Sequence, residues 1–591
     1  MWPLTRKSTT VVSWRGSPSG GKRSARAGFA LEATLILLVL LTALISAALA
    51  TTIMVQRTAG VDYRAARATY AAESGADHVM AQLEADVQDG SISDAELAAL
   101  TPPAISGFNL TVRGTRVGAA VPRTIANGPY AGLFGLNQQI DITVHADDPN
   151  ANRADAVVSV NAQTIPLFQF GVFYEEDLEI HNGPPMSFAG WVHTNGNLYL
   201  SSDNTFFQDL ITTPGTVTWD RKAYADRRNG IWINNAAAVP VNLTFDSRSK
   251  PVPNDFRAAS QASFDGRLMT AAHGVTPLRL PLPAGMPAVE LIRPRAGDPP
   301  EVQKVKEAWL ADLYVTVDLN QLGATCAAPG TPQYLPRPNG RQAPDAVDCA
   351  LIFRGRPNAF FDGREDIGVD VLDVDVGALG DWIAANQPGR RVDILYITFI
   401  NANAGVATAD FPAVRLINGS VLRYPLTVAT DRPVYVKGDY NSGAWRPAAI
   451  LSDAVTFLSA GWDDAAHAGF PANPTAASGE MWVFAAIAAG HSATPCDYQV
   501  AGCLVQRYGG GLENFPRFLE RWSGVQMHYR GSLVSLFQSQ FANLHDWNWR
   551  HYYDPPNRDW QFDTRFRDPT QLPPGTPVTA TVSQIAFRPV Y

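Results

Sequence analysis

One uncharged apolar stretch near the N-terminus constrains this chain more than any other feature of its sequence. Residues 33–55 contain no Asp, Glu, Lys or Arg. As a helix, a run of this length spans a bilayer core of about 30 Å. The preceding residues 1–28 carry six basic residues and no acidic one, and a positive flank of this kind stays in the cytoplasm. The chain from Gln56 onward is therefore expected to be exported.

The length of the apolar stretch favours a retained anchor over a cleaved secretory signal, whose apolar core usually has about 7 to 15 residues. The whole chain has 47 basic and 55 acidic residues, a net charge of −8. Without the six leader charges the balance is 41 against 55, so the exported part has a net charge of −14. An acidic exported part gives no positive field that would attract nucleic acid.

A short motif at the head of the apolar stretch points to a specific kind of processing. It reads Ala27-Gly28-Phe29-Ala30-Leu31-Glu32 and resembles a type IV prepilin cleavage site. The resemblance implies that a prepilin peptidase cuts after Gly28 and exposes the Phe29 amine. It also implies that Glu32, buried among apolar groups, pairs with the terminal ammonium of a neighbouring subunit. Major pilins carry this acid at the fifth mature position, whereas Glu32 is the fourth.

Small apolar residues continue past the membrane stretch at steps of three or four. The stripe consists of Val61, Ala65, Ala68, Ala72, Gly75, Val79 and Leu83. The segment 63–76 resembles the N-terminal region of PilX-like minor pilins and pilus assembly proteins. Such a stripe allows helices to approach closely in a filament. It equally suits an amphipathic helix that lies on its own globular domain, and the pattern leaves both interpretations open.

The exported part reads as rich in short strands. Its 47 Gly and 43 Pro residues favour many strands joined by turns. Alternating segments at 140–144 and 158–162 predict a β-hairpin. Later strand-like pieces at 190–200, 434–440 and 527–533 each meet Gly and polar residues. This pattern favours a β-solenoid body, with a β-sandwich as the alternative.

A Pro-rich segment with two expected helices, at 255–269 and 302–313, interrupts the strand pattern and is interpreted as a mixed α/β insertion. The expected fold is mainly β with a long N-terminal α-helix. The expected division is a basic leader (1–28), the pilin-like helix (29–95), a small β module (96–165), the first part of the body (166–250), the insertion (251–390) and the second part with an aromatic C-terminal region (391–591).

The body as a unit, from residue 168 to about 566, resembles large exported proteins of Gram-negative bacteria that carry the same kind of N-terminus. The resemblance is carried by the motifs at 196–199, 433–441, 509–520 and 529–533. The resemblance indicates where the body is located in the cell more than what it does there.

All four cysteines lie beyond the apolar stretch, in the part expected to meet an oxidising compartment. The simplest of three connectivities joins Cys326 to Cys349 and Cys496 to Cys503. A zinc site is the weaker alternative, because the spacings lack paired C-x-x-C motifs. A weak calcium candidate is the loop Asp148-x-Asn150-x-Asn152, which more often forms a polar turn.

The sequence contains no nucleophile elbow, no metal-binding His pair and no phosphate loop. Acids and bases that could line one face of a solenoid are His193, Asp439, Asp453, Asp463, Asp464 and His467. The favoured interpretation is that these six residues cap turns and have no catalytic role. An aromatic cluster in the C-terminal region either closes the end of the body or forms a recognition surface, with Trp547, Trp549, Tyr552, Tyr553 and Trp560 as the recognition candidates.

Together these features predict a non-enzymatic, pilin-like structural or assembly subunit of a type IV pilus-like system. Its body would serve adhesion or interactions at a filament tip. The expected location is the inner membrane, crossed once, with a periplasmic body that later reaches a pilus or the cell surface. Expected partners are other pilins, the prepilin peptidase, and a surface glycan or protein. The alternatives are an anchored β-solenoid enzyme acting on polysaccharide and a pseudopilin-like secretion component.

Overall fold

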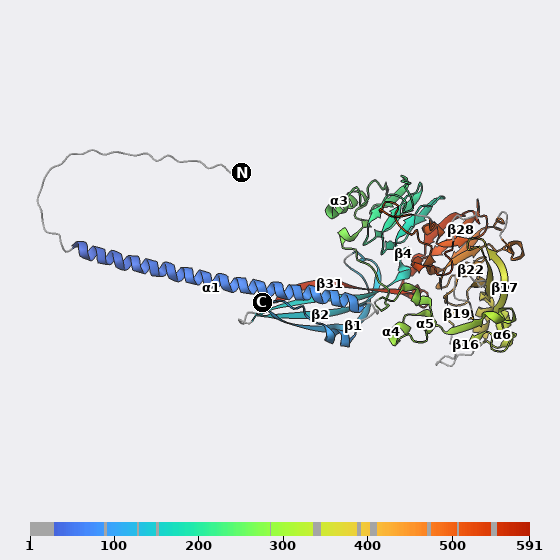
Figure 1. Ribbon diagram of the computed structural model, residues 1–591, viewed down its shortest axis with the longest axis horizontal. Coiled ribbons are helices and arrows are strands. Elements are labelled where there is room, and N and C mark those ends of the chain that lie inside the picture. Colours follow the sequence, from blue (N-terminus) through green and yellow to red (C-terminus); the bar gives the residue numbers. More distant parts are fainter. Residues whose placement is uncertain are drawn as a thin grey trace.

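A single long helix, a small antiparallel sheet and a large β-rich body follow one another along the longest axis of the molecule (Figure 1). The computed structural model describes residues 29–87, 92–126, 129–148, 153–283, 285–334, 344–386, 392–401, 411–469, 474–504, 508–544 and 552–590. Helix α1 (Phe29–Asp86) is, within these ranges, the one helix that is long and apolar enough to cross a membrane. Its first half projects away from the sheet and the body.

The second half of α1 packs on a four-stranded antiparallel sheet, and we call the helix and sheet together the module. The strands are β1 (Asn109–Thr124), β2 (Phe134–Asp147), β3 (Arg153–Pro166) and β31 (Val578–Val590), in the order β1-β2-β3-β31. The predicted hairpin is confirmed, because β2 pairs with β3 and Ile142 faces Val158. The short helix α2 (Asp94–Ala99) begins at Ser93, whose side chain accepts a hydrogen bond from the Glu96 N–H.

The last strand of the module comes from the far end of the chain. Residues 391–591 were expected to belong to the body, but Val578–Val590 pairs with β3 from Pro166↔Val578 to Asp155↔Val590. Ala580 and Val582 join the apolar cluster beneath α1. Residues 167–577 are therefore one large insertion between two neighbouring strands of the module.

The body is organised around an eleven-stranded sheet in which β4 (Val172–Tyr174) pairs on both sides. One neighbour is β7, and the other is β29, from near the end of the body. The order of the sheet is β14-β10-β7-β4-β29-β26-β23-β21-β19-β15-β16, and all its pairs are parallel except β15–β16. The early and late parts of the body thus share one continuous sheet.

On the β7 side, short parallel strands from successive passes of the chain lie in register, and we call this part the first stack. Beside the large sheet it has sheets of order β11-β8-β5 and β13-β12-β9-β6. Its strands are β5 (Leu178–Ile180), β6 (Met186–Phe188), β7 (Val192–Thr194), β8 (Leu198–Leu200), β9 (Thr205–Phe207), β10 (Ile211–Thr212), β11 (Val217–Thr218), β12 (Ile231–Asn234), β13 (Pro240–Asn242) and β14 (Leu268–Met269).

The part on the β29 side, the second stack, repeats this arrangement with longer strands. Sheets of order β17-β18-β20-β22-β24-β27 and β25-β28-β30 accompany the large sheet. The strands are β15 (Leu313–Asp318), β16 (Gln333–Tyr334), β17 (Phe353–Asp362), β18 (Ile367–Asp375), β19 (Ile394–Ile400), β20 (Pro412–Ile417), β21 (Leu426–Thr430), β22 (Val434–Lys437), β23 (Ala448–Ser452), β24 (Val455–Leu458), β25 (Met481–Phe484), β26 (Ala486–His491), β27 (Pro516–Phe518), β28 (Gln526–Gly531), β29 (Leu533–Gln538) and β30 (Asn557–Phe562).

Glycine and polar residues at the strand ends form corners that repeat from one pass to the next. A Cβ on Gly196 would lie 2.5 Å from the backbone nitrogen of Asp177 in the neighbouring pass. The next residue, Asn197, donates its backbone N–H to the Asp177 carboxylate at 2.7 Å. Gly at this corner is therefore required by the close approach of the passes, which explains the strand-then-Gly pattern of the sequence.

The helices of the expected insertion are shorter than predicted. Helix α3 spans Pro253–Phe264 and ends at Asp265, whose φ is +52°, so Leu268–Met269 forms a strand instead. The second expected helix breaks into α4 (Pro300–Gln303) and α5 (Glu307–Leu310), and Leu313 begins β15. The remaining helices are α6 (Ala346–Ile352) and α7 (Val376–Asn386).

The segment between α3 and β15 covers the outer face of the large sheet. Leu278, Leu282 and Leu291 belong to the same apolar cluster as Tyr396, Ala449 and Val534 of the sheet. The cluster also includes Ile125, Tyr130 and Ile165, so it joins the module to the body. A parallel sheet needs both faces covered, and this segment supplies the second cover. The chain is thus mainly β, with several sheets and a long N-terminal helix.

Candidate functional site

The first half of α1 offers an apolar surface that the chain itself does not cover. The most apolar 18-residue window of the helix is 0% buried. Glu32 lies in the first turn and is exposed. Gly28 falls outside the described residues, and cleavage before Phe29 stays a prediction. An exposed apolar helix needs a membrane or partner helices around it.

The stripe of small residues divides at the edge of the sheet. Ala72, Val79 and Leu83 are fully buried against the module's own strands. Val61 remains 49% exposed and Ala65 is exposed as well. Packing on the chain's own domain therefore holds for the C-terminal part of the stripe. The N-terminal part stays open for a neighbouring helix.

The cysteines form the two disulfides that the sequence predicted. Cys326 is bonded to Cys349, and Cys496 to Cys503. The second bridge closes a loop that reaches across to the first stack. In this loop Asp497 accepts a hydrogen bond from Tyr199 at 3.2 Å, and Tyr498 donates to Asp220 at 2.8 Å.

His193 lies in a packed aromatic environment rather than in a cleft. It is 0% exposed and stacks on Phe173 with 5.3 Å between ring centroids. Its two ring nitrogens lie 2.8 Å from Thr212 Oγ1 and 2.9 Å from Asn195 Oδ1. Burial lowers the pKa of His193 to about 4, so the ring is neutral at physiological pH.

The other acid and base candidates hold turns and strand ends together. Asp453 is buried and accepts hydrogen bonds from the backbone N–H groups of Gln540, Phe541 and Ala542. The remaining four are likewise engaged: Asp464 pairs with Arg415, His467 stacks on Trp462, Asp439 accepts from the Trp482 N–H, and Asp463 accepts from the Ala465 N–H. Each of the six has an evident structural role.

The recognition surface expected from aromatic residues is not where the described side chains lie. Tyr552, Tyr553 and Trp560 are only 3%, 6% and 5% exposed. Their rings belong to the large apolar core cluster that includes residues of both stacks, because burial of large rings removes much apolar surface from water. Trp547 and Trp549 lie outside the described residues.

No group of three or more His, Cys, Asp or Glu side chains suited to a metal ion occurs in the described ranges. For the calcium candidate, Asn150 and Asn152 lie outside those ranges.

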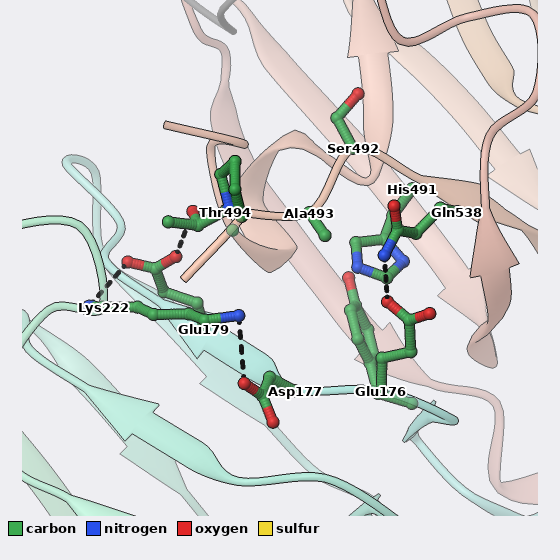
Figure 2. Close-up of a pocket in the computed structure, with 12 residues that line it drawn as sticks. Glu176, Asp177, Glu179, Lys222, His491, Ser492, Ala493, Thr494 and Gln538 are labelled. Atoms are coloured by element: carbon green, nitrogen blue, oxygen red, sulfur yellow. Dashed lines mark hydrogen bonds and ion pairs between the residues drawn. The ribbon is translucent and has the colours of Figure 1, made fainter. Parts of the chain in front are cut away.

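A polar pocket of about 340 Å³ lies between the two stacks (Figure 2). We call it the junction pocket. Strand β4 and the first stack contribute Tyr174, Glu176, Asp177, Glu179 and Lys222. The second stack and the segments on either side of its disulfide loop contribute His491, Ser492, Thr494, Gly511 and Gln538. Residues more than 300 positions apart in the chain therefore meet in one cavity.

Each carboxylate of the junction pocket has a protein partner. Lys222 Nζ lies 3.0 Å from Asp177 Oδ2, and Gln538 donates to Glu176 Oε2 at 2.8 Å. Glu179 accepts from the Thr494 hydroxyl at 2.8 Å and from the backbone N–H of Lys222 at 3.1 Å (Figure 2). Burial, together with the positive charge of Lys222, lowers the pKa of His491 to about 4. The pocket combines acceptors, donors and a neutral imidazole.

Gly511 closes the back of the pocket. Its φ is +63°, and a Cβ there would lie 2.7 Å from the Glu179 carbonyl oxygen and 2.8 Å from Glu513 Oε2. Behind it, Glu513 is 6% exposed and accepts hydrogen bonds from the His181 N–H and the Tyr508 hydroxyl. The sequence analysis used the glycines at 509–511 as part of the motif at 509–520, found no phosphate loop in the chain and did not predict a pocket there. The signal it missed is a glycine run beside a buried acid.

Glu513 makes the stability of the pocket region depend on pH. Burial raises the pKa of Glu513 from 4.5 to about 7. Folding therefore favours its protonated form, and this contribution is fully present below about pH 4.5 and is lost as the pH rises through 7. We expect the denaturant midpoint to fall between pH 5 and pH 8, and Glu513→Gln to flatten the fall. Glu84→Gln, at an exposed site on α1, is the matched control and should leave the slope unchanged.

Comparisons with known proteins give no family for this chain. No family model matches it, and no curated protein matches it. Among solved structures it is similar to the competence-associated pilin ComZ from Thermus thermophilus, with 9% sequence identity and a TM-score of 0.24. The likeness covers 89% of this chain and 97% of that one. A likeness at this identity and TM-score assigns neither a fold nor a function to the chain.

Proposed function

We propose that this protein is a non-enzymatic, pilin-like subunit of a type IV pilus-like system. Its body would be presented outside the cytoplasm, for adhesion or for contacts at a filament tip. We infer further that the body is a β-solenoid, built from stacked passes of the chain. The inner membrane holds the subunit before assembly, and other pilins surround its helix afterwards.

The observation that carries the proposal is the placement of the body relative to α1. The body is inserted between β3 and β31, and it lies at the end of the module opposite to the free half of the helix. The most apolar window of that half has no cover from its own chain. A subunit with this shape could pack its helix among others while its bulk stays clear of the helix bundle.

Stacked parallel strands support the solenoid. Val172, Val192 and Ile211 of three successive passes face one another in register, and so do Leu178, Leu198 and Val217. In the second stack, parallel pairs link β18, β20, β22, β24 and β27 in chain order.

We propose a non-enzymatic role because of where the candidate acids and bases lie. A polysaccharide-active enzyme would need carboxylates converging on a cleft with His193. His193 instead packs between aromatic rings, and it does not line the junction pocket. The pseudopilin alternative shares every feature of the module.

Processing of the leader tests the proposal directly. The full chain is co-expressed in membranes with an active prepilin peptidase, and its N-terminus is read by mass spectrometry. We expect a mature protein that begins at Phe29. Gly28→Val should retain the leader, whereas the control Gly21→Val in the same leader should be processed normally. An intact leader in the unmodified chain would contradict the proposal.

Incorporation into filaments tests the role of Glu32. In cells that assemble pili, we expect the chain in the sheared filament fraction, and Glu32→Gln to leave it in the membrane fraction. The reason is that the carboxylate would have to pair with a subunit's terminal ammonium inside an apolar bundle. Glu73→Gln, on the same helix, is the control. Equal incorporation of the Glu32 variant would exclude this contact.

A further inference from the structure

We propose that the junction pocket binds a neutral saccharide unit through its hydroxyl groups, which would make the body a glycan-binding module. The biological purpose of such binding rests on the proposed function, because a surface subunit needs a ligand. The binding itself can be tested without any filament.

The first reason is a buried hydroxyl that no protein group satisfies. Tyr174 is 1% exposed and lines the pocket, yet its Oη has no hydrogen-bond partner in the described structure. Its ring packs against His491, with 5.1 Å between centroids, and against Phe515 at 6.0 Å. Burial, and secondly the nearby Glu513, raise the pKa of Tyr174, so the hydroxyl stays protonated. An unmatched buried hydroxyl costs free energy, and a ligand in the pocket could satisfy it.

The second reason is the surplus of acceptor positions on the same wall. A carboxylate has about four acceptor positions. Glu176 uses Oε2 for Gln538, and its Oε1 has no hydrogen-bond partner among the described residues. Asp177 uses both oxygens, for Asn197 and Lys222. Glu176 can therefore accept a further hydroxyl donor, while Tyr174 and Lys222 can donate to ring or hydroxyl oxygens.

The charge distribution favours a neutral ligand over a cation. Lys222 already compensates Asp177, with a side chain that is only 11% exposed. Glu179 lies at 6% exposure with both oxygens hydrogen-bonded. A second cation would therefore have to compete with Lys222. A polyol needs only hydrogen bonds, and the pocket contains both hydrogen-bond donors and hydrogen-bond acceptors.

The walls of the pocket are held rigidly enough to preserve this arrangement. Gly511 leaves no room for a side chain at the back. The disulfide Cys496–Cys503 closes the loop that directly follows Thr494, and the hydrogen bonds of Tyr199 and Tyr498 tie that loop to the first stack. A cavity of about 340 Å³ lies at the lower end of the range for small-ligand sites. Its size suits one or two sugar rings.

The test measures binding to the full-length protein in detergent. Probes are the methyl glycosides of glucose, galactose, mannose and N-acetylglucosamine, with methylammonium chloride as the cation probe. Saturation-transfer NMR detects binding, and calorimetry gives the dissociation constant. We expect at least one glycoside to bind. Tyr174→Phe should weaken that binding about tenfold, as the loss of one hydrogen bond predicts, and Glu176→Gln should weaken it as well.

A matched control separates binding from folding. Tyr440 is also 1% exposed with an unpartnered hydroxyl, but it lies outside the junction pocket. Tyr440→Phe should therefore bind as the unmodified protein does. Neither Tyr→Phe change should lower the melting temperature, because each removes an unsatisfied polar atom.

Three results would overturn the inference: no glycoside binds, methylammonium alone binds, or Tyr174→Phe binds as tightly as the unmodified protein. None of these three results would count against the proposed role in pilus assembly. Conversely, a retained leader with intact glycoside binding would remove the pilin-like role and keep the pocket. The two failures are thus distinguishable.

Discussion

Deletion of residues 578–591 is expected to unfold the module while the body stays folded. The deletion removes β31, which pairs with β3 along its whole length. It takes Ala580, Val582 and Phe587 from the cluster under α1 and leaves β3 as an unprotected edge strand. The loss is on the order of 5 kcal/mol, comparable with the whole stability of a small domain.

Hydrogen exchange is the measurement that separates the two parts. Amides of β2 and β3 should lose their protection in the deletion variant, while those of β21 and β23 keep theirs. Single substitutions grade the effect: Val582→Asp places a charge in the cluster under α1, whereas Gln584→Asp changes an exposed position of the same strand. Unchanged protection of β3 after the deletion would show that the module is complete without its C-terminal strand.

The second large effect is expected at Arg415, which should lose about 3–5 kcal/mol of unfolding free energy on replacement by Leu. Its guanidinium lies 2.6 Å from Asp373 and 2.6 Å from Asp464, and its side chain is 3% exposed. Asp373 has a side chain that is 2% exposed. Without Arg415, the one cation paired with Asp373 among the described residues would be the partly exposed Arg356. A buried carboxylate that loses its main counter-charge is costly.

The contrast with an exposed ion pair makes this prediction specific. Arg423 pairs with Asp381 at the surface, where the two side chains are 54% and 64% exposed. Arg423→Leu should change the unfolding free energy by less than about 1 kcal/mol. Arg415→Lys should recover only part of the loss, because an ammonium cannot make both bidentate contacts. Denaturant unfolding of the four proteins, unmodified included, measures this. Equal effects at the two arginines would contradict the structural assignment.

Local patterns in the sequence predicted those features that depend on neighbouring residues. The apolar run at 33–55 required a helix, and the alternation at 140–144 and 158–162 required paired strands. Cysteines close in the chain formed the expected disulfides. These predictions succeeded because periodicity and loop length act over short distances.

Long-range strand pairing could not be predicted from the sequence, because the alternation of apolar and polar residues in a strand does not identify the strand with which it pairs. The alternation at Val578–Val582 fits any half-buried strand, and only the fold placed it beside β3. The expected helix at 302–313 failed for a similar reason: Leu313 gains more as the start of β15, in register with Leu395. Tertiary context outweighed local propensity there.

The sequence by itself determined a membrane-length helix with a basic flank, a β-rich part beyond it and two local disulfides, because charge, hydropathy and short-range spacing are properties of the chain. Only the tertiary structure decided that the body is an insertion within the module and that Tyr174, Glu176 and His491 share a pocket. These residues meet because β4 pairs with β29 across most of the body's length. Contacts of that range are selected by packing of the whole core and leave no local signature in the sequence.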